Sequence, residues 1–353
     1  MVHENVATTG SSPDDFASEE ISATTSETAR ATSINQSNTI SSLQVVRESL
    51  LQQGVPRQAA KIISQSWRTG TCKQYGVYIK QWCDFCSRRK IDYRSPSTSV
   101  NSVLEFLTIL YNRGLSYSSI NTARSALGSL CFDKDTIGMH PLIRRFMKGI
   151  FQERPALPRY NGEMWDVSKV MTLLRSWSPG KYLSLKQLTF KLIMLLLLAS
   201  TQRGQTVLYF LLKNLRFQDG KAIFVIGDLL KTSRPGSHIG SVVFEEYEEH
   251  KLCVVRYLKQ YIKRTEFLRH GEDRLLISYQ KPYNAVGRDT LSRWTRTVMT
   301  LAGIDTKIFK PHSTREASTS KAFAQHKPLQ DILDSAGWKS ERTFHKFYRR
   351  NIQ

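Results

Sequence analysis

Residues 185–204 read LKQLTFKLIMLLLLASTQRG, and they contain the strongest structural signal in the chain. The apolar residues surround the whole helix instead of forming one stripe, which predicts a helix buried at the centre of a domain. The longest apolar run, residues 192–199, has eight residues, whereas a membrane-spanning helix needs about twenty. The stretch therefore predicts a core helix and argues against a membrane span.

Downstream of this helix, short strands are predicted on either side of a tight turn. Residues 214–217 and 221–226 flank Asp219-Gly220, a pair typical of a two-residue hairpin. Residues 241–244 are predicted as a third strand. Helical patterns return at residues 250–268, 288–302, 315–325, 329–336 and 341–350. We therefore predict that residues 167–353 form a mixed α+β domain with a small antiparallel sheet.

Upstream of the core helix, the patterns are helical. Residues 75–86 repeat apolar side chains every three to four positions, and Pro56 suits the start of a helix. Three more helical patterns cover residues 100–110, 120–130 and 141–150. Residues 44–152 are therefore predicted to form an all-α domain. Residues 153–166 contain two prolines and a glycine, and they are predicted to link the two domains.

The charge of the chain is divided unequally along its length. Residues 1–43 hold nine Ser, seven Thr, six acidic residues and one basic residue, a composition that predicts a disordered acidic tail. The remaining residues hold 50 basic and 24 acidic side chains, a net charge of +26. Such an excess favours a polyanionic partner, either nucleic acid or an anionic membrane surface. The tail is interpreted as a solubilising segment or as a competitor for the basic surface.

The five cysteines and the N-terminus carry no export or metal signal. The cysteine number is odd, and Cys83 and Cys86 form the only CxxC pair, without a second pair to complete a zinc site. We interpret that pair as two small side chains one helical turn apart. The N-terminus lacks a basic start followed by an apolar stretch. The sequence thus predicts a reduced intracellular protein without metal or cofactor.

Six side chains of the second domain are candidates for a catalytic site. Taken singly, each has an ordinary structural explanation, such as a cation at a helix end before a glycine stop, a solvated lysine or a core aromatic. Ser313–Glu316 also fits a capping box with Ser313 as N-cap, which would place two of the candidates at a helix N-terminus. What is specific is their order and spacing: Arg203, Lys231, His312, Arg315, Trp338 and Tyr348.

In this order and spacing the chain resembles the tyrosine recombinase (phage integrase) family over roughly residues 50–350. The helical domain is similar to the core-binding (SAM-like) DNA-binding domain of that family, including TCKQY at 71–75 and WCDF at 82–85. The segments KTSRPG at 231–236 and FHKFY at 344–348 look most like the recombinases of DIRS-type retrotransposons. The resemblance implies a DNA-binding helical domain followed by a catalytic domain.

The resemblance also implies roles for the candidates. Tyr348 would be the nucleophile that forms a 3′-phosphotyrosyl bond, and Arg203 and Arg315 would bind the scissile phosphate. Lys231 would be the general acid toward the leaving 5′ oxygen. These residue types suit the chemistry independently, because planar guanidiniums stabilise a pentavalent phosphorus with extra negative charge. The phosphotyrosyl ester conserves the energy of the broken bond, so neither ATP nor a metal is needed.

The two remaining candidates and some departures complete the comparison. His312 would assist proton transfer and phosphate binding, and Trp338 would pack against the site and donate its indole N–H. Many family members have an acidic residue where this chain has Thr206. Tyr348 lies one residue further from Trp338 than in many relatives, and the usual position holds Phe347, which cannot act as a nucleophile. Few residues follow Tyr348, which argues against exchange of a C-terminal helix between subunits.

The leading hypothesis from the sequence is a strand-exchange recombinase that integrates a mobile element. Its partner would be double-stranded DNA, bound by a homotetramer on paired sites with a dimer on each, in the nucleus and not at a membrane. One alternative is a catalytically inactive DNA-binding protein derived from such an element, and another is a type IB topoisomerase. A covalent adduct with DNA distinguishes an enzyme from a binder, and strand exchange between two duplexes distinguishes a recombinase from a topoisomerase.

Overall fold

The chain forms two compact units, which divide between Leu157 and Pro158. Of the predicted tail over residues 1–43, only the last two residues lie within the part that the structure describes, and they begin the first helix. The computed structural model describes residues 42–93, 99–130, 137–155, 163–177, 179–231, 233–236, 238–338 and 340–352.

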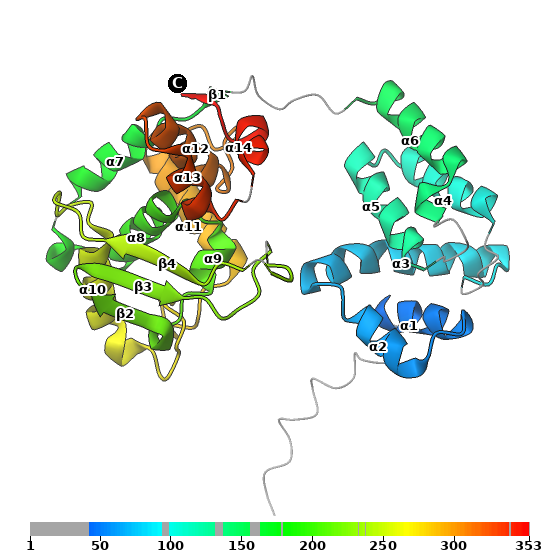
Figure 1. Ribbon diagram of the computed structural model, residues 1–353, viewed down its shortest axis with the longest axis horizontal. Helices are drawn as coiled ribbons and strands as arrows, with labels where there is room; N and C mark the ends of the chain where they lie inside the picture. Colours follow the sequence, from blue (N-terminus) through cyan, green and yellow to red (C-terminus); the bar gives the residue numbers. More distant parts are fainter. Residues whose placement is uncertain are drawn as a thin grey trace, which may run out of the picture. The chain divides into compact units, whose positions relative to one another are not determined.

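The first unit is helical throughout its described residues, as predicted (Figure 1). Pro56 precedes the second helix and Pro141 is the first residue of the last, positions where the missing N–H of proline has no helical partner to lose. The helices are α1 (Ser42–Gln52), α2 (Arg57–Ser64), α3 (Thr69–Arg89), α4 (Val100–Asn112), α5 (Tyr117–Gly128) and α6 (Pro141–Glu153).

Aromatic side chains of α3 and α4 build the core of this unit. The Trp82 ring is fully buried, with its centroid 5.4 Å from that of Phe85 and 5.3 Å from that of Phe106. Such ring pairs contribute about 0.5–1.5 kcal/mol beyond the area they bury. Trp82 and Phe85, part of the motif that resembles the core-binding domain, therefore hold the helices together. Cys83 and Cys86 lie one turn apart on α3, as the sequence predicts.

The second unit combines helices with a small sheet, which confirms the predicted fold class (Figure 1). Its three-stranded antiparallel sheet has the order β2-β3-β4. The strands are β1 (Glu163–Met164), β2 (Leu215–Gln218), β3 (Lys221–Val225), β4 (Ser241–Glu245) and β5 (Asn351–Ile352). The α-helices are α7 (Val167–Ser176), α8 (Leu185–Ser200), α9 (Gly204–Leu208), α10 (Val254–Thr265), α11 (Arg288–Leu301), α12 (Ser313–Ala324), α13 (Leu329–Ala336) and α14 (Glu341–Phe347).

The turn between β2 and β3 is the predicted two-residue hairpin. Asp219 and Gly220 have φ angles of 49° and 72°, the left-handed pair that the tightest hairpin turns require. On the other side of β3, Lys221 lies opposite Glu245, and the two side chains form an ion pair at 2.7 Å. The turn therefore sets the register of β2 on β3, and the exposed ion pair lies across the pairing of β3 with β4.

Helix α8 is the centre of the second unit, with α10, α11 and α12 packed against it. One charged residue, Lys191, is fully buried among its apolar side chains. Lys191 Nζ donates a 2.6 Å hydrogen bond to the Leu174 carbonyl oxygen and lies 4.4 Å from the centroid of the Tyr257 ring. Burial, with a smaller contribution from Lys251, lowers the pKa of Lys191 to about 8. No helix in the described ranges is long and apolar enough to cross a membrane.

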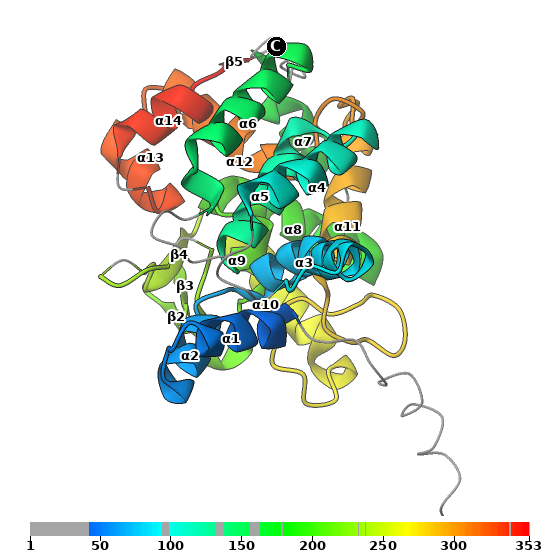
Figure 2. The same cartoon turned by 90° about the vertical axis from the view of Figure 1, so that its right-hand side faces the viewer.

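The ends of the second unit pair with each other. Strand β1 runs parallel to β5, with Glu163 opposite Asn351 and Met164 opposite Ile352. Strand β5 lies beside the C-terminus (Figure 2). Trp165 follows β1 and is 1 % exposed, so residues 163–166, assigned to the linker from sequence, pack into the second unit. Two residues per strand give no alternating pattern, which is why the sequence did not reveal this pair.

Candidate active site

Arg203 lies in the connection between α8 and α9. Helix α8 ends at Ser200, and Thr201 takes a left-handed φ of 52°. Arg203 is the N-cap residue of α9 and is half-buried, so Gly204 begins a new helix. The sequence also allowed Arg203 to be a cation at the end of a helix that Gly204 stops. In the structure, Gly204 instead begins α9, a short helix that follows α8.

One serine of α13 fixes this connection. The Ser335 hydroxyl donates to the Ser200 carbonyl oxygen at 3.2 Å and lies 3.1 Å from Thr201 Oγ1. The side-chain amide of Gln202 donates to the Ser335 carbonyl oxygen. The three residues that precede Arg203 are therefore tied to the last turn of α13.

Arg315 lies in the first turn of α12, but the predicted capping box is wrong. His312 is the N-cap residue, and it makes no side-chain capping bond. The Ser313 hydroxyl accepts a 2.9 Å hydrogen bond from the Trp165 indole N–H, and the Glu316 carboxylate accepts one from Arg350 Nε at 3.0 Å. Tertiary partners thus occupy both side chains that would have formed the local box.

The Arg315 guanidinium is buried but only partly hydrogen-bonded. The residue is 3 % exposed, and Nη2 donates to the Ala336 carbonyl oxygen at 2.6 Å. Nε and Nη1 have no hydrogen-bond partner within the described part of the chain. Burial, and next the positive charge of Arg203, lower the pKa of Arg315 to about 10, while the Tyr348 phenol opposes this change. Arg203, Arg315 and Tyr348 are thus close enough to interact electrostatically.

Trp338 and Tyr348 cover the guanidinium of Arg315. The Arg315 Cζ atom lies 4.5 Å from the centroid of the Trp338 ring and 5.6 Å from that of Tyr348. The two rings are 4.2 Å apart between centroids and inclined by 38°. Trp338 therefore presents its ring face, and not an edge, to both neighbours. Gly337, with a φ of +67°, ends α13 and turns the chain toward Trp338.

Tyr348 lies just beyond the last helix, so the predicted helix over residues 341–350 is too long. Helix α14 ends at Phe347, and Tyr348 is its C-cap residue. The carbonyl oxygen of Tyr348 accepts a 2.5 Å hydrogen bond from the Ser320 hydroxyl, which itself accepts from Arg350 N at 3.3 Å. Contacts with α12 therefore end the helix and fix the backbone beside Tyr348.

The structure brings four of the six candidates together and leaves two at exposed positions. Arg203, Arg315, Trp338 and Tyr348 form one cluster, the arginine cluster. Lys231 is exposed in the connection between β3 and β4, and His312 is exposed at the start of α12. In the described ranges no hydrogen bond or ion pair links Lys231 or His312 to the arginine cluster.

The comparison with solved structures finds site-specific recombinases and integrases. XerH, a site-specific recombinase in a post-cleavage complex with its palindromic difH substrate, matches with a TM-score of 0.56 and 14 % identity, covering 87 % of this chain and 92 % of that one. The fold is that of the tyrosine recombinases. The Tn1549 transposon integrase bound to circular intermediate DNA matches with a TM-score of 0.50 and 11 % identity, covering 88 % of this chain and 95 % of that one. No protein-family model and no curated protein matches the sequence.

Arg315, Trp338 and Tyr348 come from the segment that contains α12, α13 and α14, drawn in brown to red in Figure 1, and Arg203 comes from the connection between α8 and α9. Sequence reasoning missed one residue that organises the arginine cluster, Ser335. A serine on an amphipathic helix is typical of an exposed face, and its bonds to residues 200–202 span more than 130 positions. No local signal could have identified it.

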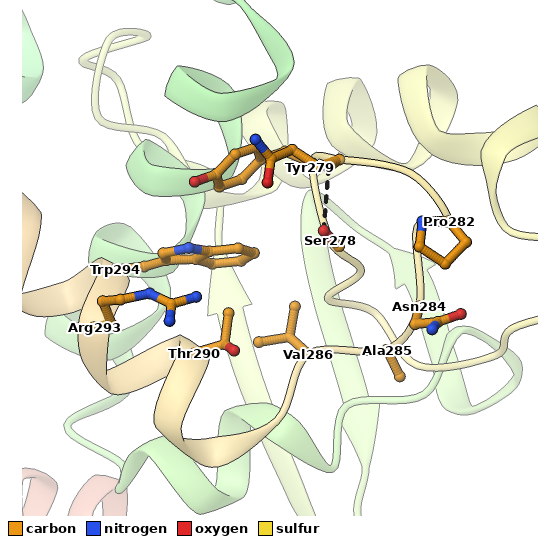
Figure 3. Close-up of a pocket in the computed structure, with 10 residues that line it drawn as sticks. Ser278, Tyr279, Pro282, Asn284, Ala285, Val286, Thr290, Arg293 and Trp294 are labelled. Atoms are coloured by element: carbon orange, nitrogen blue, oxygen red, sulfur yellow. Dashed lines mark hydrogen bonds between the residues drawn. The ribbon is translucent and has the colours of Figure 1, made fainter.

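A separate pocket of about 210 Å³ lies beside α11, away from these residues. Figure 3 shows the Tyr279 and Trp294 rings along one side, with centroids 4.9 Å apart, and Arg293 below them. None of the six candidates lines it. The lining contains one charged group, Arg293, and no carboxylate, so it does not offer the acid–base pair that a second catalytic site would need.

Proposed function

We propose that this chain cuts and rejoins DNA through a covalent bond between Tyr348 and a 3′ phosphate. The observation that carries the proposal is the state of Arg315, a buried guanidinium with two unpartnered nitrogens beside Arg203 and Tyr348. A buried polar group without a partner costs about 1–3 kcal/mol, and more when it is charged. An anion that enters the cluster would relieve this cost.

A phosphodiester is the anion that suits two arginines and a phenol. Guanidiniums bind phosphate oxygens through paired hydrogen bonds, and Arg315 has Nε and Nη1 available for such a pair. Charge on the phosphate oxygens increases in the pentavalent transition state, so these donors would bind that state more strongly than the substrate. The Trp338 ring lies against the Arg315 guanidinium and keeps it in place. The Nε and Nη1 atoms of Arg315 would then bind the phosphate oxygens.

The reaction uses the chain's own side chains for every bond change. The Tyr348 hydroxyl transfers its proton to His312 or to water as its oxygen forms a bond to phosphorus, and the bond between phosphorus and the 5′ oxygen breaks. Lys231 donates a proton to that oxygen, and His312 assists proton transfer at the exposed end of α12. A 5′ hydroxyl that attacks the phosphotyrosyl bond reverses these steps and reseals a strand.

DNA as the substrate is supported by the charge of the folded part, +26 outside residues 1–43. Affinity should fall steeply with salt, by about 0.9 log units per log unit of salt for each phosphate contact. A nearly flat salt titration would contradict this. Deletion of residues 1–43 should leave affinity unchanged or raise it, because the segment is acidic.

The finer assignments are part of the same proposal. XerH is described in complex with difH, and the Tn1549 integrase with circular transposon DNA, which supports recombination and mobile-element integration for this chain. The resemblance to DIRS-type recombinases supports a retrotransposon origin and action in the nucleus. We further propose a homotetramer on paired sites, with a dimer on each duplex.

Tyr348→Phe is the decisive variant. It deletes only the hydroxyl and retains the ring that stacks on Trp338, so fold and DNA affinity should survive while cleavage disappears. On a nicked substrate that loses its 5′ fragment, the native protein should form an adduct that resists denaturant, and Tyr348→Phe should form none. Tyr283→Phe, in the loop before α11, is the matched control and should behave like the native protein.

Mass spectrometry of the digested adduct should place the nucleotide on the peptide that contains Tyr348. An adduct on another residue, or normal cleavage by Tyr348→Phe, would reject the mechanism. DNA binding without an adduct on the cognate site would favour the inactive DNA-binding protein, and relaxation of supercoils without strand exchange would favour a topoisomerase.

A further inference from the structure

The connection between β3 and β4, which carries Lys231, contains a polar network that the six candidates do not explain. Ser233 Oγ lies 2.7 Å from His238 Nδ1, and His238 Nε2 lies 2.7 Å from the Ile226 carbonyl oxygen. The Leu230 backbone N–H donates to Ser233 Oγ at 2.9 Å. These bonds join residues near the beginning, the middle and the end of the connection.

The chemistry of the partners sets the direction of this network. A carbonyl oxygen only accepts hydrogen bonds, so His238 Nε2 carries the proton and donates to Ile226. In the neutral imidazole Nδ1 then accepts from the Ser233 hydroxyl, whose oxygen accepts from the Leu230 N–H. Each donor in the network therefore has an acceptor. The network ends at the backbone N–H of Leu230, the residue directly before Lys231.

A second contact joins the same connection to the arginine cluster. Side-chain carbons of Ile239 occupy the space where a Cβ atom of Gly337 would lie. Gly337 stands between Ala336, whose carbonyl oxygen accepts from Arg315, and Trp338, which stacks on Arg315. The connection that carries Lys231 thus packs on the turn that positions the buried guanidinium.

We propose that Ser233 and His238 are positioning residues that fix the backbone at Lys231, so that its ammonium can protonate the leaving 5′ oxygen. This inference rests on the proposed function, and neither residue touches a reacting atom. Ser233 and His238 do not form a hydrolytic pair. Ser233 is only 7 % exposed, and the far nitrogen of His238 faces a neutral carbonyl instead of the carboxylate that would stabilise an imidazolium.

The test compares two nicked DNA substrates, one with the normal 5′ bridging oxygen and one with sulfur at that position. A sulfur leaving group needs no proton, so it removes the requirement for Lys231. Ser233→Ala and His238→Ala should slow cleavage of the normal substrate about 10- to 100-fold, as misplaced catalytic groups do, and cleave the sulfur substrate at nearly the native rate. His250→Ala, at an exposed histidine in the turn after β4, should leave both rates unchanged.

A double variant tests the dependence on Lys231. Lys231→Ala combined with His238→Ala should cleave the normal substrate no more slowly than Lys231→Ala alone, because a positioning residue has nothing left to position. Ile239→Ala, which weakens the contact with Gly337 but keeps the hydrogen bonds, should show the same rescue by sulfur.

Equal slowing on both substrates, additive losses in the double variant, or an unaffected rate in Ser233→Ala and His238→Ala would overturn the inference. Loss of cleavage of the sulfur substrate by Ser233→Ala, His238→Ala and Ile239→Ala would also overturn the inference, since the network would then serve the fold alone. If the native protein forms no Tyr348 adduct with either substrate, the proposed function itself fails, which is a different result.

Discussion

Two buried arginines of the second unit differ in how completely they are hydrogen-bonded. Arg269 is 7 % exposed, and all three guanidinium nitrogens donate, to oxygens of Thr265, Arg274 and Leu275. Arg315 is 3 % exposed, and among the residues that the structure describes only its Nη2 has a hydrogen-bond acceptor. Burial lowers the pKa of both, but the charge of Arg203 lowers that of Arg315 further.

Under the proposed function, the difference separates an arginine that stabilises the fold from one that binds the scissile phosphate. The bonds of Arg269 join the end of α10 to the segment at residues 274–275 and offset the desolvation of its charge. Arg315, with one hydrogen bond and two unpartnered nitrogens in the described part of the chain, offsets less of its desolvation. Sites that bind charged ligands commonly retain such a cost, because the ligand removes it.

The largest effect should come from replacing Arg315 with lysine, and Arg269→Lys is the control. Arg315→Lys should reduce the cleavage rate about 10²- to 10³-fold, since an ammonium cannot reproduce the paired donors. Arg269→Lys should leave cleavage almost unchanged. Single-turnover cleavage of a nicked substrate measures both, and near-native cleavage by Arg315→Lys would remove Arg315 from phosphate binding.

The free energy of unfolding should depend more on Arg269 than on Arg315, the reverse of the cleavage rate. Arg269→Ala should lower the free energy of unfolding of the second unit by about 2–4 kcal/mol, because it leaves buried carbonyl oxygens without donors. Arg315→Ala should lower it by less, since it removes an unfavourable charge along with one hydrogen bond. Urea denaturation compares the two, and a greater loss for Arg315→Ala would contradict the division between them.

Lys191 provides a third buried cation whose cost depends on pH. Its pKa is about 8 in the folded chain against an ordinary 10.5, so between these values the unfolded chain binds a proton that the folded chain does not. Stability from this group therefore rises as the pH increases from 8 to 10.5. Lys191→Met should raise the free energy of unfolding by about 1–3 kcal/mol at pH 7, and the gain should shrink through that range. A gain that does not depend on pH would exclude the charge as its cause.

The smallest effect concerns the repulsion between the two site arginines. Arg203→Ala should impair cleavage yet stabilise the DNA-free protein by about 1 kcal/mol, which corresponds to a rise in Tm of about 2–4 °C for a unit of this size. The gain should diminish in high salt, which screens partly exposed charges. A fall in Tm would mean that Arg203 contributes more packing than repulsion.

The sequence predicted the elements whose patterns are local. The buried α8, the Asp219-Gly220 hairpin and the helices of the first unit follow from apolar spacing and turn chemistry. Its predictions failed where tertiary contacts override local preference. The Ser313 hydroxyl accepts a hydrogen bond from the Trp165 indole instead of forming a capping box. Helix α14 ends before Tyr348, where the Ser320 hydroxyl donates to the Tyr348 carbonyl oxygen.

The candidate site also has features that the sequence predicted and features that only the structure shows. The order of its residues along the chain identified four that the structure gathers, Arg203, Arg315, Trp338 and Tyr348. What the order could not show is that two nitrogens of Arg315 have no hydrogen-bond partner in the described part of the chain, that Ser335 bonds to residues 200–201, or that Ile239 contacts Gly337. Such contacts depend on three-dimensional packing, for which the sequence carries no periodic signal.

The pairing of β1 with β5 has an entropic consequence for Tyr348. A residue that follows the last helix of a domain ordinarily frays and samples many backbone states. Here α14 restrains the chain before Tyr348, and the bond from Ser320 and the pairing of Asn351 with Glu163 restrain it after. Fixing one backbone residue costs about 1–2 kcal/mol of free energy. The backbone at Tyr348 is already ordered in the folded protein, so a reaction at Tyr348 does not require this loss of conformational entropy.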